Sequence, residues 1–482
     1  MPSLPLPLSR FHSLRKAVRL PGALLVLTSG LFAQGRFGPG FEVYRQYCGT
    51  CHGSGMQGAR APALNDGNWK YGGSDVEIAR VISEGVVEAG MPGFGSVLSG
   101  EEIGGIVRLM RQFETMRQGR ADESKANTHE NPRASERMRF RLESVADELE
   151  IPWSFDFLPD GGLIVSERPG ALRFIHDGVV SPPVAGTPEP WVRQDGGYFA
   201  LALDPDYATN GWIYLSFSEA GAELGTSMTK LVRGRVRDHR WVDEEIVWAA
   251  PPALYTESNI HYGCRLLFHD GLLYFSLGDH DDRPAAQDLG SQLGKIHRVN
   301  PDGTAAAGNP FANRPGALAT IWSYGHRNPQ GLVITADGTM WSSEHGPMGG
   351  DEINRIEPGA NYGWPLTTHG LEHTGEKVSE HTSLPGMEDP ATVYVPSIAT
   401  TGMAVAESAR YPAWADNLFL GSMVSQELIR LEVVDDQIVH QESLLKGVGR
   451  VRDLRFGPDG LLYVSIERFG RTGEIVRLLP LE

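Results

Sequence analysis

The stretch Asp270-Gly271-Leu272-Leu273-Tyr274-Phe275-Ser276-Leu277 decides the fold, because its phrase recurs along most of the chain. Each copy is a short turn, an apolar strand and then a second strand that carries Arg or Lys. The copies begin at Asp160, Asn210, Asp270, Asp337, Asp416 and Asp459. Six copies of one strand–turn–strand unit predict a six-bladed β-propeller of four-stranded blades rather than a β-sandwich. We therefore expect a mainly β fold, in which the strand near residues 140–145 pairs with the last blade.

A helical pattern precedes these repeats. Apolar residues recur at helical spacing between residues 34 and 118, and sequences typical of a helix start begin at Ser74 and Ser99. Residues 119–138 are polar and almost free of large aliphatic side chains, as in a flexible linker. The chain is therefore predicted to hold a small all-α domain at 34–118, a linker at 119–138 and the propeller at 139–482.

The first 33 residues have the pattern of a secretory signal peptide. A basic segment ends at Arg19, the apolar run Leu20–Phe32 follows, and cleavage fits after Ala33. That run is too short to span a bilayer comfortably. The formal net charge of −17 disfavours nucleic acid or an anionic membrane surface as a partner. We expect a periplasmic protein without a membrane span that binds no nucleic acid.

The run CGTCH (48–52) is the attachment signature of c-type haem. In this pattern the thiols of Cys48 and Cys51 bond to the haem vinyl groups, and His52 ligates the iron. A redox dithiol would need a βαβ context, and a zinc site would need two further ligands, whereas the remaining cysteine is Cys264. The haem interpretation is favoured, and it implies a one-electron carrier.

The sixth ligand of the haem iron is predicted to be Met91, which lies in a loop rich in Gly and Pro. Met56 is too near His52 in sequence to reach the opposite face, and Met110 lies on a helix stripe typical of a core. A His/Met pair raises the haem potential and suits electron acceptance. The domain at 34–118 resembles a class I cytochrome c.

The propeller repeats carry polar residues where strands end. Different blades contribute Gln194–Gly197, His261–Arg265, Asp279, His326–Asn328, Glu344–Pro347 and Arg450–Arg452. For any one of these residues a structural hydrogen bond in a turn is the commoner explanation. Their joint occurrence predicts a general base beside a site for an anionic ligand.

The motifs GHRNPQG (325–331), SEHGPMGGDEIN (343–354) and NYGWP (361–365) carry a family resemblance. With them, residues 140–482 resemble the soluble PQQ-dependent aldose dehydrogenases of the glucose/sorbosone dehydrogenase family. The resemblance implies oxidation of an aldose sugar at C1 to a lactone. It also implies the cofactors PQQ and Ca²⁺, with electrons passing to the fused haem c and on to an external acceptor, a cytochrome or oxidase.

The resemblance also implies roles for individual residues. His261 would be the base that takes the C1 hydroxyl proton, Asp279 would orient it, and Arg327 would stabilise charge on the quinone oxygen. Cofactor binding would fall to Gln194, Arg327, Asn328, Arg450 and Arg452. The carbonyls of Gly346 and Pro347 would hold a Ca²⁺ beside PQQ. A second, structural Ca²⁺ would use Asp351, Glu352 and the Tyr362 carbonyl.

Some positions depart from the family pattern. Cys264 replaces the usual Gly and is expected to be a buried small residue, the alternative being an oxidation-sensitive thiol. Val395 replaces an aromatic residue, Ser397 replaces Thr, and a cofactor-contacting Lys is absent near Val424. These differences favour the aldose dehydrogenase branch of broad sugar range and leave the preferred sugar open.

Two other functions are compatible with a propeller joined to a cytochrome. A Ca²⁺-dependent lactone hydrolase would need Glu and Asp ligands in the channel, and it would explain neither the haem nor the arginines at 450 and 452. A non-catalytic propeller could instead dock a partner onto the cytochrome, and replacing His261 would then leave every activity intact.

Overall fold

The computed structural model divides the chain into two compact units, Met1–Phe113 and Glu114–Glu482. The residues that the structure describes are 43–44, 47–52, 56, 61–64, 67, 69–111, 129, 131–372, 376–406, 409–468 and 472–481. The predicted signal peptide, residues 1–33, lies outside this set. No helix in the described part of the chain is long and apolar enough to cross a membrane.

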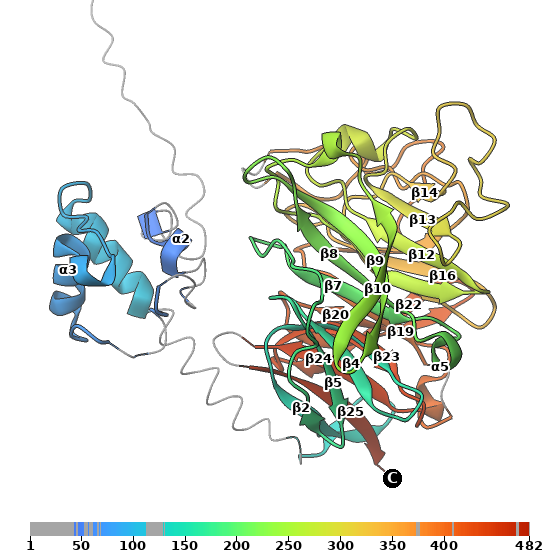
Figure 1. The fold of residues 1–482 in the computed structure, drawn as a ribbon, viewed down its shortest axis with the longest axis horizontal. Coiled ribbons are helices and arrows are strands. Elements are labelled where there is room, and N and C mark those ends of the chain that lie inside the picture. Colours follow the sequence, from blue (N-terminus) through green and yellow to red (C-terminus); the bar gives the residue numbers. More distant parts are fainter. Residues whose placement is uncertain are drawn as a thin grey trace, which may run out of the picture. The chain divides into compact units, whose positions relative to one another are not determined.

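The first unit is helical, as predicted. It contains α2 (Gly49–His52), α3 (Asp75–Glu84), the 3₁₀ turn η1 (Val87–Ala89) and a helix at 100–111 (Figure 1). Both predicted helix starts are present.

The helix starts are capped in the same way. The Ser74 hydroxyl accepts from the Glu77 backbone N–H, while the Glu77 carboxylate accepts from the Ser74 N–H. Ser99 and Glu102 repeat this pair of bonds. These bonds satisfy donors that a helix leaves unpaired at its start.

The second unit consists of six antiparallel sheets, which confirms the predicted six-bladed propeller. Blade 1 is β3 (Pro152–Phe157), β4 (Leu163–Glu167), β5 (Ala171–His176) and β6 (Val179–Val180). Blade 2 is β7 (Tyr198–Leu203), β8 (Ile213–Ala220), β9 (Ser227–Arg237) and β10 (Arg240–Ala249). Blade 3 is β11 (Leu266–His269), β12 (Leu272–Leu277), β13 (Lys295–Val299) and β14 (Ile321–Tyr324).

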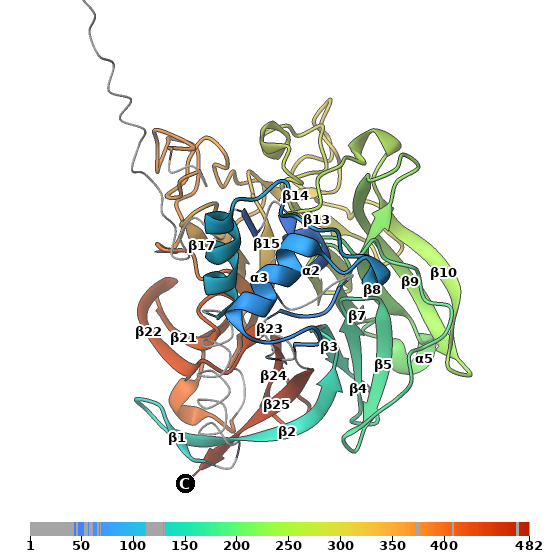
Figure 2. The same cartoon turned by 90° about the vertical axis from the view of Figure 1, so that its left-hand side faces the viewer.

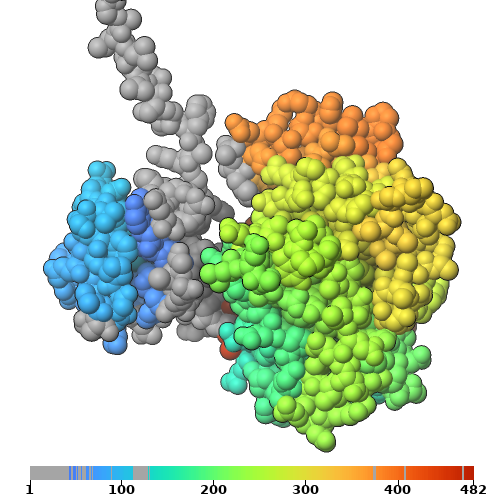
Figure 3. Space-filling model, turned by 45° about the horizontal axis from the view of Figure 1, so that its top comes forward, coloured from blue at the N-terminus to red at the C-terminus, as the bar shows by residue number. Residues whose placement is uncertain are grey.

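The remaining blades follow in sequence order, and residues of blades 4 and 5 form the adjacent yellow and orange parts of the surface in Figure 3. Blade 4 is β15 (Pro329–Ile334), β16 (Met340–Glu344), β17 (Asp351–Ile356) and β18 (Thr392–Tyr394). Blade 5 is β19 (Thr400–Val405), β20 (Leu418–Ser422), β21 (Glu427–Val434) and β22 (Gln437–Lys446). Blade 6 is β23 (Arg450–Phe456), β24 (Leu462–Glu467), β25 (Gly473–Leu481), β2 (Arg139–Leu149) and β1 (Arg133–Ala134). Short helical turns in the loops are α5 (Tyr207–Asn210), η2 (Pro252–Leu254), η3 (Arg283–Ala286) and η4 (Pro412–Trp414).

The ring is closed by a strand from the start of the propeller. β2 pairs with β25 in antiparallel register from Arg139 opposite Leu481 to Leu149 opposite Gly473, and the two strands lie side by side in Figure 2. This is the predicted closure. It ties the beginning and the end of the propeller together, so that separating either one breaks a ladder of backbone hydrogen bonds.

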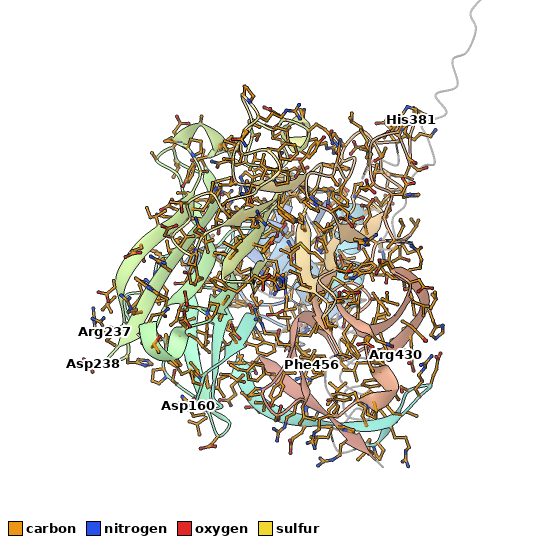
Figure 4. The ribbon with its side chains drawn as sticks, turned by 90° about the vertical axis from the view of Figure 1, so that its right-hand side faces the viewer. Asp160, Arg237, Asp238, His381, Arg430 and Phe456 are labelled. Atoms are coloured by element: carbon orange, nitrogen blue, oxygen red, sulfur yellow. The ribbon has the colours of Figure 1, made fainter. Side chains whose placement is uncertain are left out.

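The repeated turns have the backbone that their sequence requires. Asp270 and Gly271 both have positive φ, 49° and 72°, as in the two-residue hairpin turn that favours Asp-Gly. The strand that follows each turn is almost wholly buried, because neighbouring blades cover both of its faces. The turns at Asp160 and at Arg237–Asp238 project at the edge of the unit (Figure 4).

Part of the predicted linker belongs to the propeller. Residues 133–134 form β1 and pair with β2. Arg137 donates to Glu432 on β21 at 2.6 Å, and the Glu136 backbone N–H donates to Glu442 on β22 at 2.5 Å. Glu442 in turn accepts from the buried Arg430. Arg430 is labelled in Figure 4. The polar composition of this stretch therefore reflects ion pairing on blade 5 rather than a free coil.

The strand register gathers the loop residues at one end of the propeller. The first strands of neighbouring blades pack against one another around the centre. The start of each first strand lies opposite the end of the second, as Pro329 lies opposite Glu344 and Arg450 opposite Glu467. Residues that precede a first strand and residues that follow a second strand therefore share one end of the ring.

Candidate active site

His261 and Asp279 form a hydrogen-bonded pair at this end of the propeller. His261 lies in the loop before β11, and Asp279 lies just beyond the end of β12, after Gly278. His261 Nδ1 is 2.8 Å from Asp279 Oδ1, and the Asp279 side chain is fully buried. With Nδ1 donating to the carboxylate, Nε2 is the ring nitrogen left to accept a proton. The two residues that the sequence nominated as base and orienting group are thus brought together.

Asp279 has a complete set of donors. Oδ1 also accepts from the Asp281 backbone N–H at 3.0 Å, and Oδ2 accepts from the indole nitrogen of Trp364 at 2.7 Å. Burial alone would raise the pKa of Asp279. The His261 hydrogen bond and the charges of His261 and Arg327 outweigh this effect, so the pKa lies below its usual value. The carboxyl is therefore ionised and can stabilise a protonated imidazole. Trp364 belongs to the motif NYGWP, and the sequence predicted no role for it.

Arg327 is buried beside this pair. Its Nη1 donates to the carbonyls of His345, at 3.1 Å, and Gly346, at 2.7 Å. Its backbone N–H donates to the buried Glu344 carboxylate at 2.8 Å. The Nε–H of Arg327 is buried with no hydrogen-bond partner among the described residues. A buried cationic donor without an acceptor suits an anionic oxygen of a ligand.

Asn328 uses most of its amide to hold the loop that carries the base. Its Oδ1 accepts from the Gly263 backbone N–H at 3.0 Å and from Gln330 Nε2 at 3.2 Å. Its Nδ2 lies 3.4 Å from His345 Nδ1, and His345 Nε2 donates to the Thr400 carbonyl at 2.7 Å. The predicted contact between Asn328 and a cofactor stays a prediction.

Cys264 is fully buried next to this loop. Burial raises the pKa of its thiol to about 12. Cys264 packs within a hydrophobic core cluster with residues of blades 2 and 3, as a small apolar residue does.

Three arginines form a cationic cluster. Arg450 and Arg452 begin β23, and Arg452 Nε donates to Glu467, at the end of β24, at 2.5 Å. Arg450 Nε lies 3.5 Å from the same carboxylate. Burial, reinforced by the charges of Arg452 and Arg168, lowers the pKa of Arg450 to about 10. The three arginines outnumber the nearby carboxylates of Glu467 and Asp195, and this excess of positive charge suits a polyanionic ligand.

Arg168 is the member of this cluster that sequence reasoning missed. It follows β4 directly, so it lies at the same end of the propeller as the residues that follow the other second strands, and this place in the repeat was the available signal. Its Nη1 donates to the Gln194 carbonyl at 2.7 Å, while its Nε is buried without a partner among the described residues. The Gln194 side chain itself is exposed.

The predicted calcium ligands surround a tightly bonded turn. The Asp351 carboxylate accepts from Gly346 N–H, Ser397 Oγ, Ile398 N–H and Ala399 N–H at 2.6–2.9 Å. This carboxylate therefore holds the turn that presents the carbonyls of Gly346 and Pro347.

The predicted structural Ca²⁺ site at Asp351, Glu352 and Tyr362 offers less negative charge than its two carboxyl groups suggest. Burial, with the nearby carboxylates of Glu344 and Asp351, raises the pKa of Glu352 well above its usual value. The Tyr362 backbone N–H bonds the Tyr324 carbonyl. Within the described ranges, no three His, Cys, Asp or Glu side chains are grouped to hold a metal. Both calcium sites stay predictions, and the first would depend on backbone carbonyls.

In the helical unit, His52 is arranged as a metal ligand. Its Nδ1 is 2.8 Å from the Pro62 carbonyl, which fixes the ring and leaves Nε2 for iron. Cys48 is buried in the core of this unit, together with Met56 and Met110. Met91 is only partly buried and its backbone pairs with Val86. The side chain of Cys51 lies outside the described residues.

Comparison with known proteins matches both units. The family model "Glucose / Sorbosone dehydrogenase" matches residues 149–477. The model "Cytochrome C oxidase, cbb3-type, subunit III" matches residues 36–110. Aldose sugar dehydrogenase YliI of Escherichia coli (strain K12) is 38% identical over 348 residues, which are 70% of this chain and 92% of the relative.

Solved structures agree with this assignment. The soluble aldose sugar dehydrogenase from Escherichia coli, in its apo-form, has a TM-score of 0.67 at 36% identity, covering 71% of this chain and all of that one. The PQQ-bound aldose sugar dehydrogenase from Streptomyces coelicolor has a TM-score of 0.58 at 27% identity, covering 73% of this chain and all of that one. The chain therefore belongs to the glucose/sorbosone dehydrogenase family and carries a cytochrome c domain ahead of its propeller.

Proposed function

We propose that this protein is a periplasmic quinohaemoprotein that oxidises an aldose at C1 to the lactone. Its electrons would pass from PQQ to haem c on the same chain and then to an external acceptor. The observation that carries the proposal is the buried His261–Asp279 pair beside Arg327, whose Nε–H lacks an acceptor among the described residues.

The residues at this end of the propeller fit PQQ. The cofactor has three carboxylates, and the cluster of Arg168, Arg450 and Arg452 holds more positive charge than Glu467 balances. The Nε–H of Arg327, which has no acceptor in the described part of the chain, provides a buried donor for the quinone oxygen that becomes negative. PQQ supplies a two-electron acceptor for the hydride from C1.

The protein's own part in the reaction is to move and hold a proton. His261 Nε2 takes the proton of the C1 hydroxyl, and the Asp279 carboxylate stabilises the resulting imidazolium through Nδ1. The Asp351 bonds hold the Gly346–Pro347 turn, so these carbonyls keep one arrangement for a Ca²⁺. Arg327, bonded to Gly346, stays fixed against the same turn.

In the cytochrome unit, Cys48, Cys51 and His52 would hold the haem, with Met91 as sixth ligand. The His52 ring already donates through Nδ1 and presents Nε2. A c-type haem takes one electron at a time. Joining it to the dehydrogenase replaces a collision between two proteins by an encounter within one chain.

The test is anaerobic haem reduction by sugars. Haem-loaded protein is supplied with Ca²⁺ and PQQ, mixed with a panel of aldoses, and followed by haem absorption. Reduction that needs both PQQ and sugar is expected, and the panel ranks the substrates. His261→Gln should lose it. The matched control is His269→Gln, whose ring also lies beside an Asp, 3.4 Å from Asp270, but is partly exposed on β11.

The other outcomes separate the alternatives. Reduction of an artificial dye without haem reduction would keep the dehydrogenase and reject the haem as its acceptor. If neither the dye nor the haem is reduced, and the His261→Gln protein behaves like wild type, the dehydrogenase function is rejected. A propeller that docks a partner would then be favoured. Release of acid from a lactone would instead favour the hydrolase.

A further inference from the structure

Trp364 touches the catalytic carboxylate from the side opposite its histidine bond. It lies in the loop between β17 and β18 and is 5% exposed. Its indole N–H donates to Asp279 Oδ2 at 2.7 Å, while Oδ1 receives the bond from His261. The backbone of Trp364 is held at both ends, because its N–H bonds the Gly325 carbonyl and its carbonyl accepts from Gln287. The indole therefore cannot drift from the carboxylate.

The same ring supports the cationic residues of the site. The Arg327 guanidinium lies 5.3 Å from the ring centroid and that of Arg283 lies 5.5 Å from it. Arg283 is held in turn by Glu372, with Nη2 to Oε2 at 2.9 Å. One side chain thus contacts both Asp279 and Arg327.

We propose that Trp364 is a positioning residue, which aims Asp279 at His261 and tunes how strongly the pair holds its proton. The proposal rests on the proposed role of His261 as the base. A hydrogen bond to the second oxygen of a carboxylate holds the side chain in one orientation. It also lowers the basicity of the first oxygen. Trp364 thereby keeps Oδ1 in line with Nδ1 and keeps the imidazole free to accept a new proton.

The charges around the pair define the expected direction. Asp279 faces His261, Arg327 and Arg283, and His280 is its neighbour in sequence. Removing the indole N–H changes none of these charges but leaves Oδ2 without its donor. The carboxylate then becomes more basic and holds the shared proton to higher pH.

The test is Trp364→Phe, which keeps an aromatic ring under the arginines and removes the donor. The apparent pKa of the His261–Asp279 pair should rise by about one unit, the equivalent of one hydrogen bond to a charged group. It is read by NMR titration of the histidine rings in the cofactor-free, full-length protein, with His261 identified by its loss in His261→Gln. In the loaded enzyme the acid limb of kcat/KM should move upward with it. kcat should fall roughly tenfold while KM for the sugar stays nearly constant.

Trp322→Phe is the matched control. Trp322 also has a guanidinium over its ring, that of Arg298 at 4.3 Å, but its buried indole nitrogen has no hydrogen-bond partner among the described residues. This variant should leave the His261 titration and the pH profile unchanged. Equal effects from both variants would overturn the proposal, because a general packing defect would explain them.

An unmoved His261 titration in Trp364→Phe would also overturn it. If that variant does not fold, the same titration is done on the wild-type protein. The indole N–H resonance of Trp364 should then shift with pH at the same midpoint as the His261 ring. A different midpoint would reject the coupling. A wild-type protein that oxidises no sugar would defeat the proposed function alone, since both NMR readings need no substrate.

Discussion

Arg168 Nη1 donates a 2.7 Å hydrogen bond to the backbone carbonyl of Gln194, which joins the end of β4 to the loop that enters blade 2. The same guanidinium adds its charge to that of Arg450 and Arg452. Arg168 therefore contributes both to the shape and to the charge of the proposed PQQ site.

We expect Arg168→Leu to weaken PQQ binding by roughly tenfold to a hundredfold, because a charged donor to a carboxylate is lost. Equilibrium titration of the cofactor-free protein with PQQ measures this directly. Arg233→Leu is the control, since Arg233 pairs with Glu245 away from the site. Unchanged affinity in Arg168→Leu would remove this residue from the site.

Asp279→Asn should lower kcat by about three to four orders of magnitude, because an amide can neither fix the His261 tautomer nor stabilise its protonated form. Binding of PQQ should change little. Steady-state rates with an artificial dye give kcat. The exposed Asp270, which lies beside His269, provides the control, and Asp270→Asn should have wild-type rates. A near-normal kcat in Asp279→Asn would contradict the role of this carboxylate.

Glu467 should make the cofactor-free propeller sensitive to acid. Burial alone would raise the pKa of Glu467, but the charges of Arg452 and Arg450 outweigh burial and lower this pKa below its usual value. The folded pKa is then below the unfolded value of about 4.3. The unfolded chain binds more protons between the two values, so the stabilisation is present above about pH 4.3 and is lost as pH falls through the folded pKa.

This contribution can be isolated with Glu467→Gln. The difference in unfolding free energy between wild type and variant, from urea titrations, should shrink as the pH is lowered from neutral toward 3. A difference that stays constant with pH would show that the carboxylate is not held in its charged form by the arginines.

Lys295 stabilises the loop that follows Asp279. Its fully buried ammonium donates to the carbonyls of Ala285, Ala286 and Leu293 at 2.6–3.0 Å. Lys295→Met should cost about 3 kcal/mol of unfolding free energy, because three buried carbonyls lose their donor. Thermal unfolding measures the loss. Lys230→Met, which breaks a partly exposed pair with Glu219, should cost far less.

Met91 can be tested as the sixth haem ligand by Met91→Ala. The covalent haem should remain while the low-spin spectrum of the ferric form and its sulfur-to-iron band disappear, because the thioether is lost. Met110→Leu is the control, since Met110 lies in the core of this unit. If the band is lost in Met110→Leu and retained in Met91→Ala, the sixth haem ligand is Met110 and not Met91.

Much of the architecture was predictable because its signals are local. The Asp-Gly turn at 270–271 has its two positive φ values from neighbouring residues alone, and the strand pattern after it repeats six times. The haem motif and both helix caps likewise depend on spacings of a few residues. The linker estimate erred at 133–138, because polar side chains there pair with charges on blade 5 that are distant in sequence.

The site was predictable only residue by residue. His261, Asp279 and Arg327 could be named from motifs, but their contacts depend on how blades 3 and 4 meet. No site role was predicted for Arg168 or Trp364. Arg168 lies in the first blade and Trp364 in the insertion between β17 and β18, and no local pattern links either position to the site.

By itself, the sequence determined the two-part design, the number of blades and the family of this protein, since hydrophobic period and turn chemistry are written in adjacent residues. Only the tertiary structure decided that Trp364 bonds Asp279 and that Arg168 joins Arg450 and Arg452. The physical reason is ring closure. Pairing β2 with β25 closes the ring, so the starts of the first strands and the ends of the second strands share one end of the propeller. Hydrogen bonds and charges act there between residues that no local pattern connects.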